Sequence, residues 1–235
     1  MSKVIKEFSR FAHQYDQYNE IQVEVARSLI SKLPDKPFKH ILDLGCGSGA
    51  VAKYMEASRY TYETLIAFDS SEAMLEIHPS SAKITKICAD FNHIDFIKNL
   101  PRIQYDLLIS SSALQWSTNL DQTFSLLSSL SQNAYFAIFT SGTFKTLHSL
   151  AGVSSPIHSV EAVKKSIEKY YGEVSFELHY YTLIFDSVRE MFRYIKRSGV
   201  SAGEKKLGFK ETKRLIESYP LDHLEFEVLF VQAKV

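Results

Sequence analysis

The feature that most constrains the fold is a glycine-rich turn directly after a short apolar run. Residues 40–55 read HILDLGCGSGAVAKYM, with Gly45, Gly47 and Gly49 two residues apart. Glycine adopts backbone conformations that other residues avoid and lets another group approach the chain closely. In an open α/β sheet, the first strand-to-helix turn is where the backbone comes nearest a ligand. The stretch therefore predicts a buried strand whose turn borders a binding site.

Strand-like and helix-like segments alternate after this point. The strand candidates occupy residues 40–44, 64–68, 84–89, 106–111, 134–140, 174–185 and 224–234. Helices are expected near residues 49–57, 71–77 and 119–130, with a helical stretch over 142–171 and two basic helices between the last two strands. Short apolar strands between helices predict a parallel sheet covered on both faces. The predicted fold is α/β, a doubly wound Rossmann-like sheet of seven strands whose last strand is antiparallel.

We expect a single domain over residues 1–235, since no separate linker is present. Apolar and aromatic residues recur at helical spacing up to Leu33, and Pro34 and Pro37 end that pattern. Residues 1–37 are therefore predicted to form an N-terminal helical lid, residues 38–141 the ligand-binding core, and residues 142–235 an inserted helical cap with the final strands.

Composition limits the possible partners and the compartment. The chain has 27 basic and 27 acidic residues, so no global charge draws it to nucleic acid or to a membrane. No run approaches the roughly 18 apolar residues of a membrane span. Its two cysteines, Cys46 and Cys88, have the pattern of reduced thiols, without the His or acid cluster that a metal site needs. We expect a cytoplasmic, metal-free monomer.

The spacing of acids around the glycine turn indicates the ligand. Asp69 comes 20 residues after Gly49, where a carboxylate can accept hydrogen bonds from two ribose hydroxyls. The G-x-G-x-G spacing departs from the G-x-G-x-x-G of dinucleotide-binding proteins, and no Gly-Lys-Ser/Thr phosphate loop is present. Asp43, two residues before the first glycine, would repel a diphosphate and suits an amine-bearing ligand. These features predict S-adenosylmethionine (SAM), and the alternative is a tight turn that serves helix packing alone.

The motifs DLGCGSG (43–49), DSSEAML (69–75) and CADF (88–91) resemble those of the class I SAM-dependent methyltransferases. This resemblance implies that Asp69 binds the ribose, that Met74 flanks the adenine and that Asp90 accepts from its amino group, although Asp90 could instead be a loop acid or a helix cap. The predicted cofactor-binding residues are Asp43, Gly45, Cys46, Gly47, Gly49, Asp69, Ser70, Met74, Asp90, Phe91, Ser111 and Ser112.

Three further stretches are similar to the malonyl-acyl-carrier-protein O-methyltransferases of biotin synthesis: residues 8–22, 113–120 and 224–235. The resemblance implies methylation of the free carboxylate of a malonyl thioester, carried by acyl carrier protein or by coenzyme A. This carboxylate is already ionised at neutral pH, so we expect positioning and no catalytic side chain. The chain has no arginine between 142 and 160 to pair with it, which keeps another small acid or metabolite open as the substrate.

Four side chains are candidates for substrate binding: Tyr15, Gln22, Trp116 and His148. The alternatives are core packing for Tyr15 and Trp116 and a surface position for His148. A catalytically idle binding protein is disfavoured by the intact cofactor motif. A nicotinamide-dependent oxidoreductase is disfavoured by the glycine spacing.

A basic segment indicates the partner. Residues 189–214 hold nine basic and three acidic residues in a chain of zero net charge. Acyl carrier proteins are strongly acidic, as the family resemblance implies for the substrate, so Arg193, Arg197, Lys205 and Lys206 are predicted to form a docking surface. The alternative is a pair of solvated helices.

Overall fold

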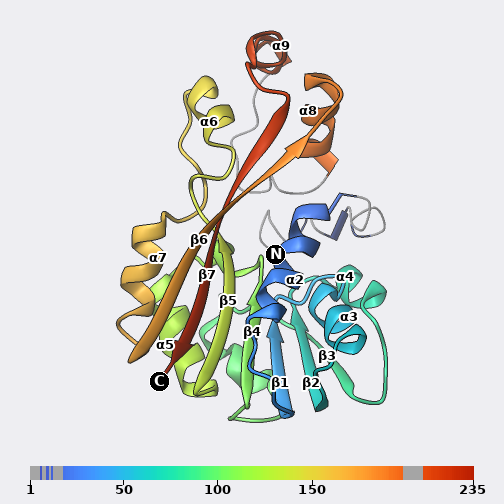
Figure 1. Cartoon of the computed structure of the whole chain (residues 1–235), viewed down its shortest axis with the longest axis vertical. Coiled ribbons are helices and arrows are strands. Elements are labelled where there is room, and N and C mark those ends of the chain that lie inside the picture. The colour runs from blue at the N-terminus through green and yellow to red at the C-terminus, as the bar shows by residue number, and fades with distance from the viewer. Residues whose placement is uncertain (1–5, 7–8, 11, 13–17, 198–208) are drawn as a thin grey trace.

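The described part of the chain is residues 6, 9, 10, 12, 18–197 and 209–235 of a computed structural model, and it contains one seven-stranded sheet (Figure 1). The strands are β1 (Phe38–Leu44), β2 (Tyr62–Asp69), β3 (Ile84–Cys88), β4 (Leu107–Ser111), β5 (Asn133–Phe139), β6 (Glu173–Ile184) and β7 (His223–Lys234). They are arranged in the order β3-β2-β1-β4-β5-β7-β6, and β7 is antiparallel to both neighbours. The predicted α/β sheet with an antiparallel last strand is confirmed.

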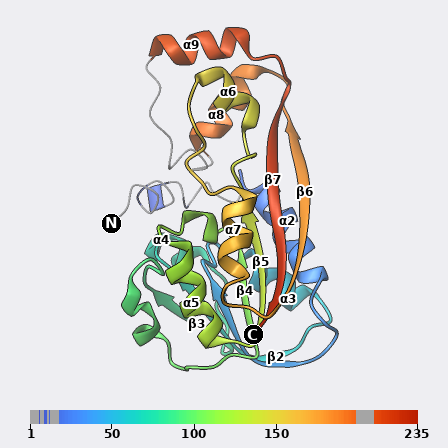
Figure 2. The same ribbon diagram turned by 90° about the vertical axis from the view of Figure 1, so that its left-hand side faces the viewer.

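Helices cover both faces of the sheet. They are α2 (Glu20–Ser31), α3 (Ala50–Ala57), α4 (Glu72–Ile77), α5 (Leu120–Leu130), α6 (Lys145–Ala151), α7 (Val160–Ile167), α8 (Val188–Arg197) and α9 (Phe209–Ser218), with 3-10 turns η1 (Ile94–Asn99) and η2 (Leu114–Trp116). Figure 2 shows α2 and α3 on one face and α5 and α7 on the other. Successive side chains along a strand point to opposite faces of the sheet and so pack into different helical layers. Ile41 packs on the α2–α3 side and Leu42 on the α5–α7 side.

The helical stretch expected over 142–171 is interrupted. Gly152, with φ of 63°, ends α6 in the left-handed conformation, and its backbone N–H bonds back to that helix. A separate helix, α7, then begins after Ser159, whose side chain accepts a hydrogen bond from the Ala162 N–H. The stretch therefore splits into α6 in the upper part of the molecule and α7 packed on the sheet (Figures 1 and 2).

Chain order places a crevice above β1 and β4. The chain runs outward from β1 to β3 and then returns to β4 on the other side of β1, and ligands of open α/β sheets bind at such a switch point. Strands β6 and β7 continue beyond β5 as a long hairpin that pairs up to Ile184 and His223. This hairpin carries α8 and α9, which lie with α6 beyond the carboxyl ends of the parallel strands (Figure 1).

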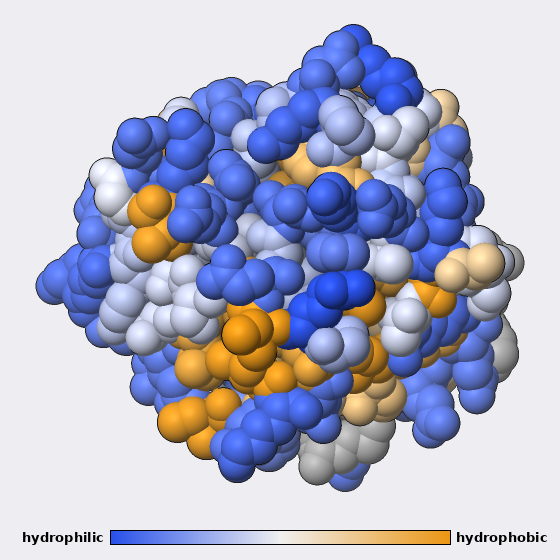
Figure 3. Space-filling view, turned by 90° about the horizontal axis from the view of Figure 1, so that it is seen from below, coloured by the Kyte–Doolittle hydropathy of each residue, from blue (hydrophilic) through white to orange (hydrophobic). Residues whose placement is uncertain are grey.

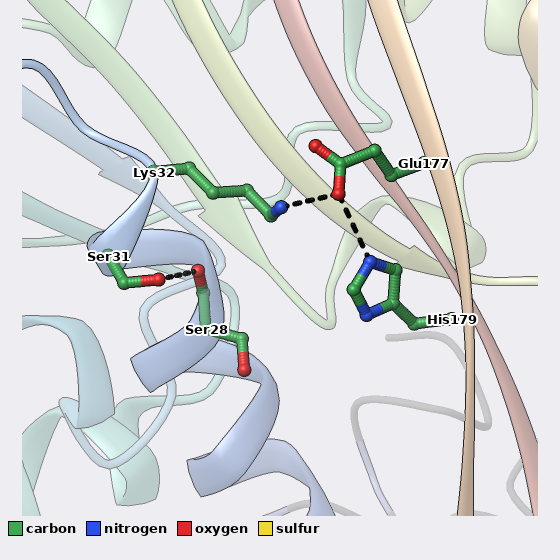
Figure 4. Close-up of polar contacts among 5 residues, drawn as sticks. All are labelled: Ser28, Ser31, Lys32, Glu177 and His179. Carbon is green, nitrogen blue, oxygen red and sulfur yellow. Dashed lines mark hydrogen bonds and ion pairs between the residues drawn. The ribbon is translucent and has the colours of Figure 1, made fainter.

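Helix α2 is attached to the hairpin by a small polar cluster (Figure 4). Lys32, the residue after α2, donates from Nζ to Oε2 of Glu177 on β6 over 2.7 Å, and Nε2 of His179 lies 3.2 Å from the same oxygen. The ammonium also lies 5.3 Å from the centre of the Phe230 ring. The pKa of Glu177 is lowered mainly by the Lys32 hydrogen bond. The cluster fixes the carboxyl end of α2, whose other end borders the crevice.

The opposite end of the sheet has a different surface. Figure 3 views the amino ends of the parallel strands, where hydrophilic residues surround a region of apolar ones. Ile103 before β4 and Val235 after β7 lie at this end and are exposed. Within the described residues, no helix combines the length and apolar character required to cross a membrane.

Candidate cofactor and substrate site

The three glycines of the turn after β1 share a backbone conformation that favours glycine, and two of them also have no room for a side chain. All have positive φ, at 74°, 52° and 87° for Gly45, Gly47 and Gly49. A Cβ on Gly45 would lie 2.2 Å from the Cβ of Ala113, and one on Gly49 would lie 2.5 Å from Cδ of Pro79. A Cβ on Gly47 would meet nothing within 4 Å, so only its backbone conformation and its place on the pocket favour glycine there.

Asp69 ends β2 and lies beside this turn. Its Oδ2 accepts the Gly47 N–H at 2.9 Å, and its Oδ1 accepts the Ser71 N–H at 2.8 Å. Burial raises the pKa of Asp69, while these backbone donors lower it. A carboxylate has about four lone-pair positions, so Asp69 can accept further donors besides these backbone N–H groups. The arrangement suits two neighbouring ribose hydroxyls.

Asp43 is fully buried at the pocket wall, and neither of its carboxylate oxygens has a hydrogen-bond partner among the described residues. Burial raises the pKa of Asp43 well above its ordinary value, and the charge of Asp69 raises it further. A buried carboxylate without donors is costly unless a bound group satisfies it. An ammonium group would do so.

Other unpartnered polar atoms border the same pocket. The Gln22 Oε1 and the hydroxyls of Ser111 and Ser112 are buried and have no partner within the described chain. Ser112 has a φ of 62°, which is rare for a residue with a side chain, and its carbonyl accepts from Nε2 of Gln115 at 2.7 Å. Together with Asp43, these groups fit the polar amino-acid end of SAM.

The loop after β3 forms the far wall. Asp90, Phe91 and Asn92 all line the pocket, and Phe91 is buried. Met74 on α4 also lines it and is 2% exposed, so the apolar sides of a flat base could be covered from both residues. Ser71, which lines the pocket as well, accepts the Met74 N–H at 3.3 Å and so caps α4.

The structure brings most of the predicted site residues together. Of the predicted cofactor residues, all but Gly49 line one pocket, and the candidate substrate residues Gln22 and Trp116 line it too. Gly49 instead starts α3 and packs toward His78 and Pro79. Gly49 therefore does not line the pocket, and its predicted role in binding the cofactor remains a prediction.

The remaining candidates lie elsewhere. His148 is buried in α6, with its ring centre 6.4 Å from that of Phe144, and is not part of the pocket lining. Tyr15, Lys205 and Lys206, and the side chain of Arg197, lie outside the described residues. Arg193 is exposed on α8.

Several polar lining residues were not predicted from the sequence: Asn19, Ser48, Ser71, Asn92 and Thr118. An amide two positions after Asp90 is typical of a side-chain turn and could have indicated Asn92. Asn19 and Thr118 could not be found because α2 and the loop after η2 reach the pocket only through the tertiary fold.

No group of three potential metal ligands occurs among the described residues. The ionisable lining residues are Asp43, Cys46, Asp69 and Asp90. The Cys46 thiol is buried, and burial raises its pKa well above the ordinary value. It is therefore a neutral thiol, unsuited to act as a nucleophile.

Comparison with known proteins gives the class. Residues 41–133 match the family model described as a methyltransferase domain. The fold resembles that of YcgJ from Bacillus subtilis, with a TM-score of 0.64 at 12% identity over 90% of this chain and 97% of that one.

It also resembles Haemonchus contortus phosphoethanolamine N-methyltransferase 2 in complex with S-adenosyl-L-methionine. The TM-score is 0.59 at 15% identity, over 96% of this chain and 57% of that one. The matched domain, the fold and the pocket identify a class I SAM-dependent methyltransferase.

Within that class, the chain resembles the malonyl-[acyl-carrier protein] O-methyltransferases. The protein of that name from Priestia megaterium is 30% identical over 153 residues, which span 61% of this chain and 54% of the relative. The one from Anoxybacillus flavithermus is 26% identical over 215 residues, 83% of this chain and 79% of the relative. A trans-aconitate 2-methyltransferase from Deinococcus radiodurans is 31% identical over 103 residues, 44% of this chain and 38% of the relative.

Proposed function

We propose that the protein transfers the methyl group of SAM to the free carboxylate of a malonyl thioester, giving the methyl ester that primes biotin synthesis. SAM supplies an electrophilic methyl group on a sulfonium. The chain's part is to hold the two reactants in line and to exclude water, which can lower the barrier by about 7–11 kcal/mol. The substrate half of the proposal is supported by the names of the relatives and by the three stretches similar to that family.

One observation carries the choice of a carboxylate acceptor. The ionisable side chains of the described lining are three aspartates and a buried thiol. Asp69 and Asp43 have geometries that suit the ribose and the ammonium of the cofactor, and Asp90 suits the adenine. A carboxylate acceptor needs no base because it is ionised at neutral pH, so these aspartates can all serve cofactor binding.

The acceptor site is proposed at the Gln22–Trp116 side of the pocket. Gln22 comes from α2 and Trp116 from η2, so they belong to separate elements. The amide N–H of Gln22 and the indole N–H of Trp116 are neutral donors of the kind that a carboxylate accepts. Tyr15 and His148 remain sequence predictions as further contacts.

We propose the exposed cap as the docking surface for acyl carrier protein. Arg189 and Arg193 on α8, and Lys213 and Arg214 on α9, are exposed. Both helices lie beyond the carboxyl ends of the parallel strands (Figure 1), and Gly45, Asp69 and Ser111 line the pocket at those ends. An acidic carrier docked here would deliver its thioester from that side, and charge complementarity would speed the encounter. The proposal places this reaction in the cytoplasm, where thiols such as Cys46 and Cys88 stay reduced.

Mass spectrometry of reaction products tests the function. The protein is incubated with SAM and with malonyl-acyl carrier protein, malonyl-coenzyme A or trans-aconitate in separate reactions. Methyl ester on the malonyl carboxylate is expected with the first two. Methylation of trans-aconitate alone would replace the proposal with the second candidate, a methyltransferase of another small acid, which the Deinococcus relative favours.

A further inference from the structure

We propose that Asn92 is a positioning residue for the adenine base of the cofactor. It holds one oxygen of Asp90 so that the other faces the exocyclic amino group, and it thereby sets the preference for adenine over a 6-keto purine. The inference rests on the proposed role of Asp90 and goes beyond it, since the family resemblance gave no role to Asn92. It stands on a hydrogen-bond pattern around a single amide.

The first half of the pattern concerns Asp90. Its Oδ1 accepts the backbone N–H of Asn92 at 2.9 Å and also the Asn92 side-chain Nδ2 at 3.1 Å. Both bonds use the same oxygen. The carboxylate is therefore fixed in rotation by Asn92, and its other oxygen is left for a ligand in the pocket that both residues line.

The second half concerns the neighbouring loop. The Asn92 Nδ2 donates its other hydrogen to the carbonyl of Trp116 at 3.3 Å. The Asn92 Oδ1 accepts the backbone N–H of Thr118 at 2.8 Å and its hydroxyl at 3.1 Å. One side chain thus connects the loop after β3 with the loop after η2, and both Trp116 and Thr118 also line the pocket.

These bonds use the full capacity of the amide. A primary amide has two N–H donors and an oxygen with two lone pairs, and all four are engaged. Turning the amide over would place its oxygen against the Asp90 carboxylate and its N–H against the Thr118 N–H. The side chain consequently has one favourable orientation, which makes the open oxygen of Asp90 a fixed feature of the wall.

A fixed acceptor discriminates between bases. Adenine presents an N–H donor at position 6, whereas hypoxanthine presents a carbonyl oxygen that a carboxylate repels. Sites built to hydrogen-bond one group reject an analogue that lacks it because their own polar atoms are then left unpaired. If Asp90 could rotate, the discrimination would weaken even though the carboxylate is still present.

The test measures base preference, which a general loss of stability does not change. Calorimetric titration gives the Kd ratio of S-inosylhomocysteine to S-adenosylhomocysteine. For the unaltered protein, we expect a ratio of about 10–150, the value of one charge-assisted hydrogen bond. Asn92→Ala should reduce this ratio at least about fivefold. Asn92→Asp keeps the acceptor for Thr118 and the backbone N–H to Asp90 but removes the side-chain donor to Asp90. It should reduce the ratio too and provides a second variant if the alanine protein does not fold.

Asn119→Ala is the matched control. Its side chain accepts the Gln122 N–H at 3.1 Å as the cap of α5, so the variant loses a loop amide without touching Asp90. It should keep the full ratio. Asp90→Ala distinguishes the role of Asp90 from the role of Asn92. If the Kd ratio falls in Asp90→Ala but not in the Asn92 variants, the role of Asn92 alone is overturned. An unchanged ratio in Asp90→Ala would overturn the assignment of Asp90 and the inference with it.

Discussion

The cofactor-binding half and the cap half of this protein are built on different principles. Around β1–β4, the site is made of short turns directly after strands: Gly47, after β1, bonds to Asp69 at the end of β2, and Asn92 bonds to Asp90 after β3. The cap depends on β6 and β7, which carry α8 and α9 away from the sheet (Figure 1). Its helices present exposed charge. Under the proposed function, turns next to the strands bind the cofactor, and the cap that the long hairpin carries selects the partner.

The largest expected effect is a loss of cofactor affinity in the cofactor-binding half. Asp69→Ala removes the proposed acceptor for two ribose hydroxyls and leaves the N–H groups of Gly47 and Ser71 without this carboxylate partner. The Kd for S-adenosylhomocysteine should rise roughly 10- to 150-fold, because a hydrogen bond to a charged group contributes about 1.5–3 kcal/mol. Isothermal titration calorimetry measures it.

Asp121→Ala is the control for that variant, since Asp121 bonds Lys169 and Ser166 between α5 and α7, away from the pocket. Its affinity should match that of the unaltered protein. Unchanged affinity in Asp69→Ala would show that the ribose is held elsewhere.

A smaller effect is expected in the cap half. Changing Arg189 and Arg193 to Glu should lower kcat/KM for malonyl-acyl carrier protein about tenfold at low salt, and less at high salt, because steering is screened. Malonyl-coenzyme A should be affected much less. The change of Arg197, Lys205 and Lys206 to Glu should act in the same direction.

The matched control reverses two exposed arginines outside the cap, Arg27 and Arg59, which make surface ion pairs, and Arg59 also lies 5.6 Å from the centre of the Tyr60 ring. It should leave both substrates unaffected. Equal losses on both substrates in the Arg189/Arg193 variant would mean that α8 supports the common pocket, and no loss on either would make the basic cap plain solvated surface.

The smallest effect concerns the support of the glycine turn. His78 is buried behind Gly49, its Nδ1 lies 2.8 Å from the Pro79 carbonyl, and its Nε2 has no partner within the described chain. Burial lowers its pKa. The neutral ring therefore stabilises the fold above the unfolded pKa of about 6.5, and this contribution is lost as the pH falls through the folded pKa.

Urea denaturation of the protein and of His78→Gln at pH 5 and pH 7.5 measures this contribution. The free energy of unfolding should decline more on acidification with His78 than with glutamine. A parallel decline in both proteins would mean that protonation of His78 does not limit acid stability.

The same comparison explains what the sequence could predict. The strands, their order of appearance and the glycine turn with Asp43 and Asp69 follow local patterns of apolar runs, glycines and acids. The family resemblance added Met74, Asp90, Phe91, Ser111 and Ser112, and the pocket contains nearly all of the predicted cofactor residues. Asn19 and Thr118 reach the pocket through packing between elements distant in the chain, which no local pattern records. His148 shows the converse, because its sequence context did not indicate that α6 would bury it beside Phe144.

The central claim is that an ionised carboxylate accepts the methyl group without a general base. The most direct measurement compares malonyl-coenzyme A with its half-amide, which has no free acid, at equal concentrations between about pH 6 and 8. We predict methylation of the acid alone, at a rate that does not rise with pH over this range. Methylation of the amide at a comparable rate, or a rate that rises with the titration of a base, would contradict the account.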